Sequence, residues 1–172
     1  KESSAASDVY KRQNLECLLK ALTIVKKKMN FHSYIVGEGK ELKDLINLSK
    51  KLDLCKNITF VGKSIDPRKF YENADIFVLC SHFEGFGNVI VEALAYNCKV
   101  ISSDCPSGPR EILENGKWGI LFPINNHESL ANSIIDISKK NLFPNSHIRA
   151  EDFSIQKIGL KYKKMFDMIL KE

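Results

Sequence analysis

Residues 75–103, DIFVLCSHFEGFGNVIVEALAYNCKVISS, contain the pattern that decides the fold. Two short apolar runs, at 75–80 and 98–103, are rich in β-branched residues and predict strands. The segment between them, 88–97, is also β-branched at its start, yet two parallel neighbouring strands need a crossover, which is usually a helix. EALA, residues 92–95, propagates a helix well. The stretch therefore predicts a strand, a glycine-containing turn, a helix buried on most sides, and a second strand.

The same alternation continues on both sides of this stretch. We expect strands at 31–37, 57–62, 75–80, 98–103 and 118–123. We expect helices at 14–30, 39–54, 66–74, 88–97, 107–115, 126–140 and 154–172. Strands separated by helices imply right-handed crossovers. The sequence therefore predicts the α/β class, with a Rossmann-like parallel sheet flanked by helices.

The composition restricts the classes of protein to which the chain can belong. It has 172 residues, of which 44% are hydrophobic, and this is enough for one globular domain with an adequate core. It contains no apolar run of about 18 residues, so we expect no membrane-spanning helix. No basic-then-apolar leader opens the chain, so we expect no secretory signal.

The cysteines, histidines and charged residues indicate which kinds of partner the protein can have. The five cysteines form no Cys-x-x-Cys pair, and three lie in or beside apolar runs, which predicts reduced thiols in a cytoplasmic protein. The four histidines show no ligand spacing, so no metal site is expected. The net charge of +5 is spread mostly over helical faces, with few aromatic residues between the basic ones. This pattern argues against nucleic acid as a partner.

Two glutamates, Glu84 and Glu92, lie on either side of a glycine-containing turn. Glu84 follows a predicted strand, at the carboxyl edge where open parallel sheets place their ligands. Gly85 and Gly87 let the backbone approach a ligand closely, and the start of the following helix offers free N–H groups to a phosphate. An acid one turn into that helix would repel phosphate. Glu92 therefore suits the vicinal hydroxyls of a ribose, and Glu84 can serve sugar hydroxyls.

The two acids also have simpler interpretations. Glu92 would complement the helix dipole from the first turn whether or not a ligand binds. Glu84 would serve equally as an ordinary acid in a loop. Spacing alone does not decide between these simpler interpretations and a paired binding site.

Residues 84–123, EGFGNVIVEALAYNCKVISSDCPSGPREILENGKWGILFP, resemble the C-terminal, donor-binding domain of the family-4 retaining glycosyltransferases of the GT-B fold. The signature of that family is a Glu, seven residues and a second Glu, with Gly-Phe-Gly after the first. Here these residues are Glu84, Gly85, Phe86, Gly87 and Glu92. The resemblance covers residues 14–172. DCPSGPREIL, residues 104–113, is similar to the branch that builds lipid-linked surface oligosaccharides from UDP-activated hexoses or N-acetylhexosamines.

The resemblance implies a hexosyltransferase that uses a nucleotide-sugar donor and needs neither a cofactor nor a metal. It implies that Glu92 binds the ribose hydroxyls, and that Glu84, as the catalytic residue, orients the donor sugar and stabilises charge near the reacting carbon. The other implied donor contacts are Gly37, Glu38, Gly39, Lys63, Ser64, Gly85, Phe86, Gly87, Asn88 and Val89. The acceptor would be a glycan or polyprenyl-linked sugar, bound by an N-terminal domain that we expect to be missing from this chain. The parent protein would then lie in the cytoplasm or peripherally on the inner face of the cell membrane.

Residues 3–13, SSAASDVYKRQ, resemble the in-frame translation of a sequencing-library adapter, with all eleven residues in order. We therefore divide the chain into a non-native, disordered tail at 1–13 and a nucleotide-sugar-binding domain at 14–172. The family carries its diphosphate-binding arginine and lysine just before the first helix, where this chain has the tail. We expect the sheet to lack its first, central strand, between 31–37 and 75–80. We also expect the chain by itself to be inactive as a transferase.

Three other functions share part of the pattern. A GT-B sugar-nucleotide epimerase has the same nucleotide pocket, although the glutamate pair with Gly-Phe-Gly argues against it. A non-catalytic nucleotide-binding module is suggested by VGEG, residues 36–39, but the third glycine of the dinucleotide fingerprint is missing. The third is a partner-interaction domain without a ligand.

Smaller features receive structural interpretations. Residues 104–111 are predicted to shape a turn at a strand end, with Glu111 early in a short helix. Asn97 is predicted to end its helix in the left-handed conformation. Trp118 is predicted to pack in the core or at its rim.

Overall fold

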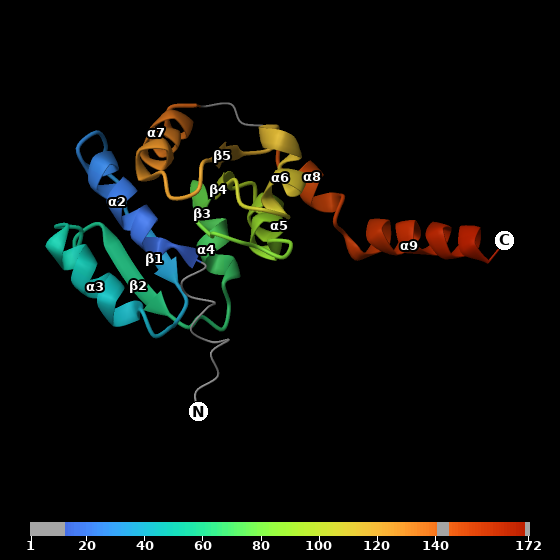
Figure 1. Ribbon diagram of the computed structural model, residues 1–172, viewed down its shortest axis with the longest axis horizontal. Coiled ribbons are helices and arrows are strands. Elements are labelled where there is room, and N and C mark those ends of the chain that lie inside the picture. Colours follow the sequence, from blue (N-terminus) through green and yellow to red (C-terminus); the bar gives the residue numbers. More distant parts are fainter. Residues whose placement is uncertain (1–12, 141–144, 171–172) are drawn as a thin grey trace.

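The computed structural model describes residues 13–140 and 145–170 of the chain, and their strands and helices alternate as predicted (Figure 1). The strands are β1 (Ser33–Val36), β2 (Ile58–Gly62), β3 (Ile76–Leu79), β4 (Lys99–Ser103) and β5 (Ile120–Phe122). The helices are α2 (Leu15–Lys26), α3 (Leu42–Lys51), α4 (Arg68–Glu72), α5 (Asn88–Ala95), α6 (Pro109–Ile112), α7 (His127–Ser138), α8 (His147–Glu151) and α9 (Ile155–Ile169), with a short 3₁₀ turn η1 (Glu114–Gly116) after α6.

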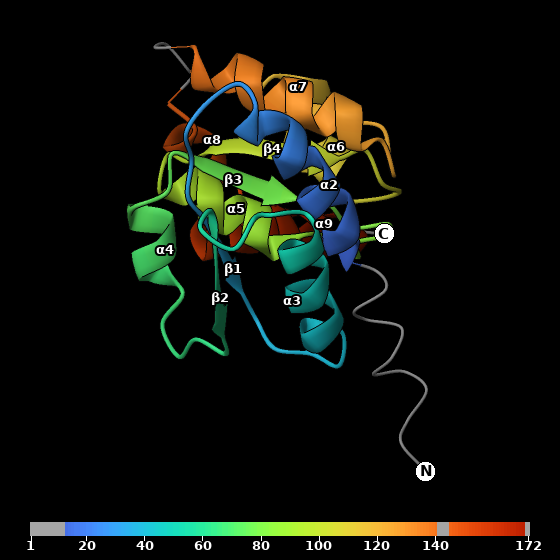
Figure 2. The same ribbon diagram turned by 90° about the vertical axis from the view of Figure 1, so that its left-hand side faces the viewer.

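The strands of the described residues form two parallel sheets. β1 pairs with β2, and β4 lies between β3 and β5. Figure 2 shows β1 and β2 running across the direction of β3. The expectation that a central strand is missing between residues 31–37 and 75–80 stays a prediction.

One buried cluster joins the two sheets. It contains the apolar face of α2, Ile35 and Ile58 from the first sheet, and Ile101 and Phe122 from the second. The helical spacing of Leu and Val along α2 places these side chains on one face, and α2 also packs along α7. The two sheets therefore share a core although no strand pairing connects them within the described residues.

The opposite face of the second sheet has its own cluster. Val100 points away from Ile101, because successive side chains of a strand alternate, and it packs with Ile90 and Leu94 of α5 and Ile112 of α6. Helices therefore cover both faces of this sheet, α2 and α7 on one and α5, α6 and α8 on the other (Figure 1). The predicted α/β class and its parallel, helix-flanked arrangement are confirmed.

Some local features differ from expectation. α5 begins at Asn88 as predicted, after Gly87 at φ 92°, but it ends at Ala95 and not at residue 97. α8 was not predicted. Asn97 has φ 58°, as expected for a residue that ends a helix. The predicted tail at 1–13 lies outside the described residues except for Gln13 and stays a prediction.

The last helix, α9, extends away from the body of the molecule (Figure 1). Many of its apolar side chains are exposed, including Ile155 at 88% and Met168 at 72%. No helix among the described residues is long and apolar enough to span a bilayer.

Candidate functional site

Glu84 lies at the carboxyl edge of the second sheet and is held by a neighbouring hydroxyl. The Ser81 hydroxyl, two residues beyond β3, donates a 2.6 Å hydrogen bond to Glu84 Oε1. The Ser103 hydroxyl, at the end of β4, donates to the Ser81 carbonyl at 2.5 Å. Ser81 and Ser103 are both buried. Two adjacent strand ends therefore fix the orientation of the Glu84 carboxylate.

The glycine turn after Glu84 is packed against the loop that precedes α6. Gly108, at φ 64°, lies so close to Phe86 that a Cβ on it would stand 1.9 Å from the Phe86 carbonyl oxygen. Gly87 is buried, and a Cβ there would stand 3.4 Å from Ile90 Cδ1. The turn predicted at residues 104–111 is thus confirmed, and it also supports the turn at residues 85–88.

The start of α5 presents backbone donors beside Glu84. The Ile90 amide bonds to the Gly87 carbonyl at 2.9 Å. Among the described residues, the amides of Asn88 and Val89 have no acceptor, as expected for the first turn of a helix. Amide donors and the positive end of the helix dipole favour an anionic ligand at this point.

Glu92 lies one turn further along α5 and is exposed. Its Oε2 accepts a 2.9 Å hydrogen bond from the Tyr71 hydroxyl of α4. Burial, and after it the hydrogen bond to Glu92, raise the pKa of the Tyr71 phenol, so Tyr71 remains a donor. An ionised carboxylate has about four acceptor sites. Glu92 can therefore accept further hydroxyl donors while Tyr71 fixes its position.

The remaining predicted residues form a second group at the ends of β1 and β2. The Gly37 amide donates to the Gly62 carbonyl at 2.8 Å. Lys63 Nζ and Glu38 Oε1 are 3.9 Å apart on exposed side chains. The Ser64 hydroxyl donates to the Asp66 carbonyl at 3.0 Å. A pocket here is lined in part by residues 36–39.

The structure thus brings the predicted residues together in two groups. Residues 84–92 gather around the start of α5, and residues 37–39 gather with 62–64 at the other sheet. Among the described residues, no hydrogen bond or ion pair joins one group to the other.

Two polar residues that bond directly to the predicted acids were not predicted from the sequence. Ser81 lies three residues before Glu84, within the range at which hydroxyl side chains commonly bond to nearby groups, so local spacing could have suggested it. Tyr71 lies 21 residues before Glu92, and no sequence signal connects the two.

In the part of the chain that the structure describes, no three or more His, Cys, Asp or Glu side chains gather as a metal site. The expectation that the protein needs no metal and no cofactor stays a prediction.

The geometry defines a Rossmann-like α/β domain with acids and backbone donors at its carboxyl edge. Comparison with known proteins gives the family: the sequence model described as "Glycosyl transferases group 1" matches residues 5–153. The chain belongs to this family of glycosyltransferases.

Individual relatives agree with the family. A Haemophilus influenzae protein named "Uncharacterized glycosyltransferase" is 29% identical over 161 residues, 90% of this chain and 46% of the relative. A Campylobacter jejuni protein named "N-acetylgalactosamine-N,N'-diacetylbacillosaminyl-diphospho-undecaprenol 4-alpha-N-acetylgalactosaminyltransferase" is 32% identical over 70% of this chain and 32% of the relative. The chain spans about half the length of the first of these relatives and about a third of the second.

A solved structure shows the same fold. The pneumococcal O-GlcNAc transferase GtfA, crystallised with UDP and GlcNAc, superposes with a TM-score of 0.79 at 24% identity. The match covers 94% of this chain and 34% of that protein.

Proposed function

We propose that this chain is the donor-binding half of a retaining glycosyltransferase that moves a hexose or N-acetylhexosamine from a nucleoside-diphosphate sugar to a growing surface glycan. The observation that carries the proposal is the arrangement around the start of α5. Glu84 is fixed by Ser81 at a strand end, Glu92 is fixed by Tyr71, and the amides of Asn88 and Val89 lie between them in sequence.

Each of these groups has a task in binding such a donor. Glu92 accepts hydrogen bonds from the two ribose hydroxyls, while Tyr71 holds its other oxygen. Glu84 accepts from the hydroxyls of the sugar and stabilises positive charge near the reacting carbon. Hydrogen bonds to a charged group contribute about 1.5–3 kcal/mol each. The two acids therefore select and orient the donor.

The start of α5 acts on the leaving group. Negative charge grows on the nucleoside diphosphate as the bond to the sugar breaks. The amides of Asn88 and Val89 and the helix dipole lie where they can stabilise that charge without rearrangement. This stabilisation needs no metal.

The donor and acceptor are proposed from the relatives. GtfA was crystallised with UDP, and the Campylobacter relative is named for an undecaprenol-linked acceptor. We propose UDP as the nucleotide and a lipid-linked glycan as the acceptor. The protein would then act in the cytoplasm or at the inner face of the membrane, with the acceptor bound by a further domain.

Titration of the chain with UDP, observed by ligand NMR, tests the proposal. Glu92→Gln should weaken UDP binding about tenfold, since it replaces a charged acceptor worth about 1.5 kcal/mol. Glu72→Gln, at an exposed acid on α4, is the matched control and should bind as the wild type does. Binding of NAD instead of UDP, no binding of either, or equal binding by both variants would contradict the proposal.

A further inference from the structure

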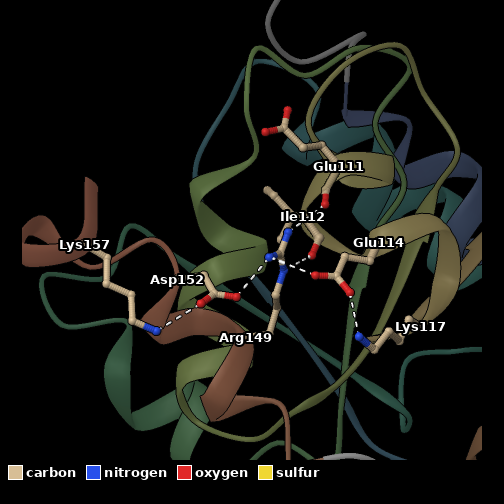
Figure 3. A network of polar contacts seen from close by, with 7 residues as sticks. All are labelled: Glu111, Ile112, Glu114, Lys117, Arg149, Asp152 and Lys157. Carbon is tan, nitrogen blue, oxygen red and sulfur yellow. Dashed lines mark hydrogen bonds and ion pairs between the residues drawn. The ribbon is translucent and has the colours of Figure 1, made fainter. Parts of the chain in front are cut away.

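Arg149 of α8 is the centre of a polar network that joins α8 to the end of α6 (Figure 3). Its side chain is only 12% exposed. Arg149 Nη1 lies 3.0 Å from Asp152 Oδ2 and 3.1 Å from Glu114 Oε1. Asp152 in turn pairs with Lys157 at 3.0 Å. The arginine is therefore held from two sides by carboxylates.

The same guanidinium binds the carboxyl end of α6. Arg149 Nε donates to the Ile112 carbonyl at 2.8 Å, and Nη2 donates to the Glu111 carbonyl at 2.9 Å. These carbonyls belong to the last turn of α6, where a cation is favoured by the helix dipole. Because a guanidinium is planar and its donors are fixed in a fork, these bonds also fix the plane of the group.

The fixed guanidinium packs against the first of two aromatic rings in contact, and the second ring belongs to the glycine turn. Arg149 Cζ lies 4.6 Å from the centre of the Phe153 ring. The Phe153 ring meets Phe86 edge to face, with centroids 5.4 Å apart and planes at 67°. Phe86 belongs to the turn of residues 85–88, between the two glycines that precede α5.

Phe86 thus makes two restraining contacts, one through its ring and one through its carbonyl, and both connect it to α6. Its ring rests on Phe153, which Arg149 supports from the end of α6. Its carbonyl lies against Gly108, the residue that precedes Pro109, where α6 begins. The contacts form a closed circuit from Phe86 through Gly108, α6, Arg149 and Phe153 back to Phe86.

We propose that Arg149 and Phe153 are positioning residues for the donor turn, residues 85–88, and act on it through Phe86. This rests on the proposed function, since it assumes that the turn binds a nucleotide-sugar. A turn with two glycines has wide conformational freedom. Its amides are aimed at a ligand only if the surroundings restrict it, and the circuit provides that restriction.

A double-mutant cycle on UDP binding tests the circuit. Phe153→Leu and Phe86→Leu should each weaken UDP binding about 3- to 10-fold, the size expected for an aromatic pair. The losses should not add, because each change breaks the same contact. The double variant should therefore bind UDP about as tightly as the single variant with the lower affinity. Phe153→Tyr, which keeps the ring, should restore binding. Phe166→Leu, at an exposed aromatic of α9, is the control and should bind as the wild type does.

Backbone amide relaxation at residues 85–88, measured by NMR, gives a readout that does not depend on UDP. Order parameters there should be lower in Phe153→Leu and in Arg149→Lys, which keeps the charge but loses the fork. Additive losses in the cycle, or unchanged order parameters in both variants, would overturn the inference. If the wild type does not bind UDP, the proposed function fails, and the relaxation measurement still decides whether the circuit positions the turn.

Discussion

At Gly108, the backbone of the loop that precedes α6 packs directly against the backbone of the glycine turn. Its φ of 64° and the 1.9 Å approach of a Cβ to the Phe86 carbonyl oxygen both exclude a side chain at this position. Gly108→Ala should lower the free energy of unfolding by more than about 1 kcal/mol, because an alanine at a positive φ is strained and its Cβ would meet backbone atoms. Urea unfolding measures this change.

Gly85→Ala is the matched control for that measurement. A Cβ at Gly85 meets nothing within 4 Å, so stability should change by less than about 0.5 kcal/mol. Equal stability of the two variants would show that the α6 loop does not lie against the turn as described.

Asp152 gives the stability a defined pH dependence. Two hydrogen bonds that the carboxylate accepts lower its pKa below the ordinary value of 3.8. The bond from Lys157 has the larger effect, and the bond from Arg149 has the second largest. The folded state therefore binds this proton less readily than the unfolded state. The stabilisation is fully present above the unfolded pKa and is lost as the pH falls through the folded pKa.

Asp152→Asn should therefore make stability fall less steeply below about pH 4. The carboxyl is 41% exposed, so solvent screening keeps the effect under about 1 kcal/mol. Urea titrations across this range measure it, with Asp44→Asn on the exposed side of α3 as the control. An equally steep fall in Asp152→Asn and wild type would refute the assignment.

At the scale of single elements, α9 depends on its own sequence more than the other helices do, because its apolar side chains are exposed. The Ser154 hydroxyl caps it by accepting from the Lys157 amide at 3.3 Å. Ser154→Ala should cost about 1 kcal/mol of helix stability, and Gly159→Ala should add up to about 1 kcal/mol. The circular dichroism signal at helical wavelengths should therefore decrease in Ser154→Ala and increase in Gly159→Ala. The same change in both variants would contradict this account.

The order of elements could be predicted because each depends on neighbouring residues. The strand at 75–80, the glycine turn and the EALA helix are local patterns, and so are Glu84 and Glu92 of the site. Ser81 bonds to Glu84 across three residues, but the other contacts that fix the acids and the turn between them are not local. Tyr71 bonds to Glu92 across 21 residues, and Arg149 bonds to Ile112 across 37. Spacing along the chain carries no signal for such pairs, because only the packed fold brings them together.

At the scale of the whole molecule, burial decides which thiols can react. All five cysteines are free, and only Cys55 is exposed. Burial raises the pKa of the Cys98 thiol to about 11 and also raises the pKa of Cys17, Cys80 and Cys105. Since the thiolate is the reactive form, a thiol reagent at neutral pH should label one cysteine quickly and the rest only after denaturation. Fast labelling of several thiols would show that the core is not formed.

The most direct test of the account is to map where UDP binds. Amide hydrogen exchange of the whole chain, with and without UDP, reports protection peptide by peptide. The account predicts that UDP slows exchange in residues 84–92, around the start of α5. Protection confined to other parts of the chain, or no protection anywhere, would contradict the assignment of this site to a nucleotide-sugar donor.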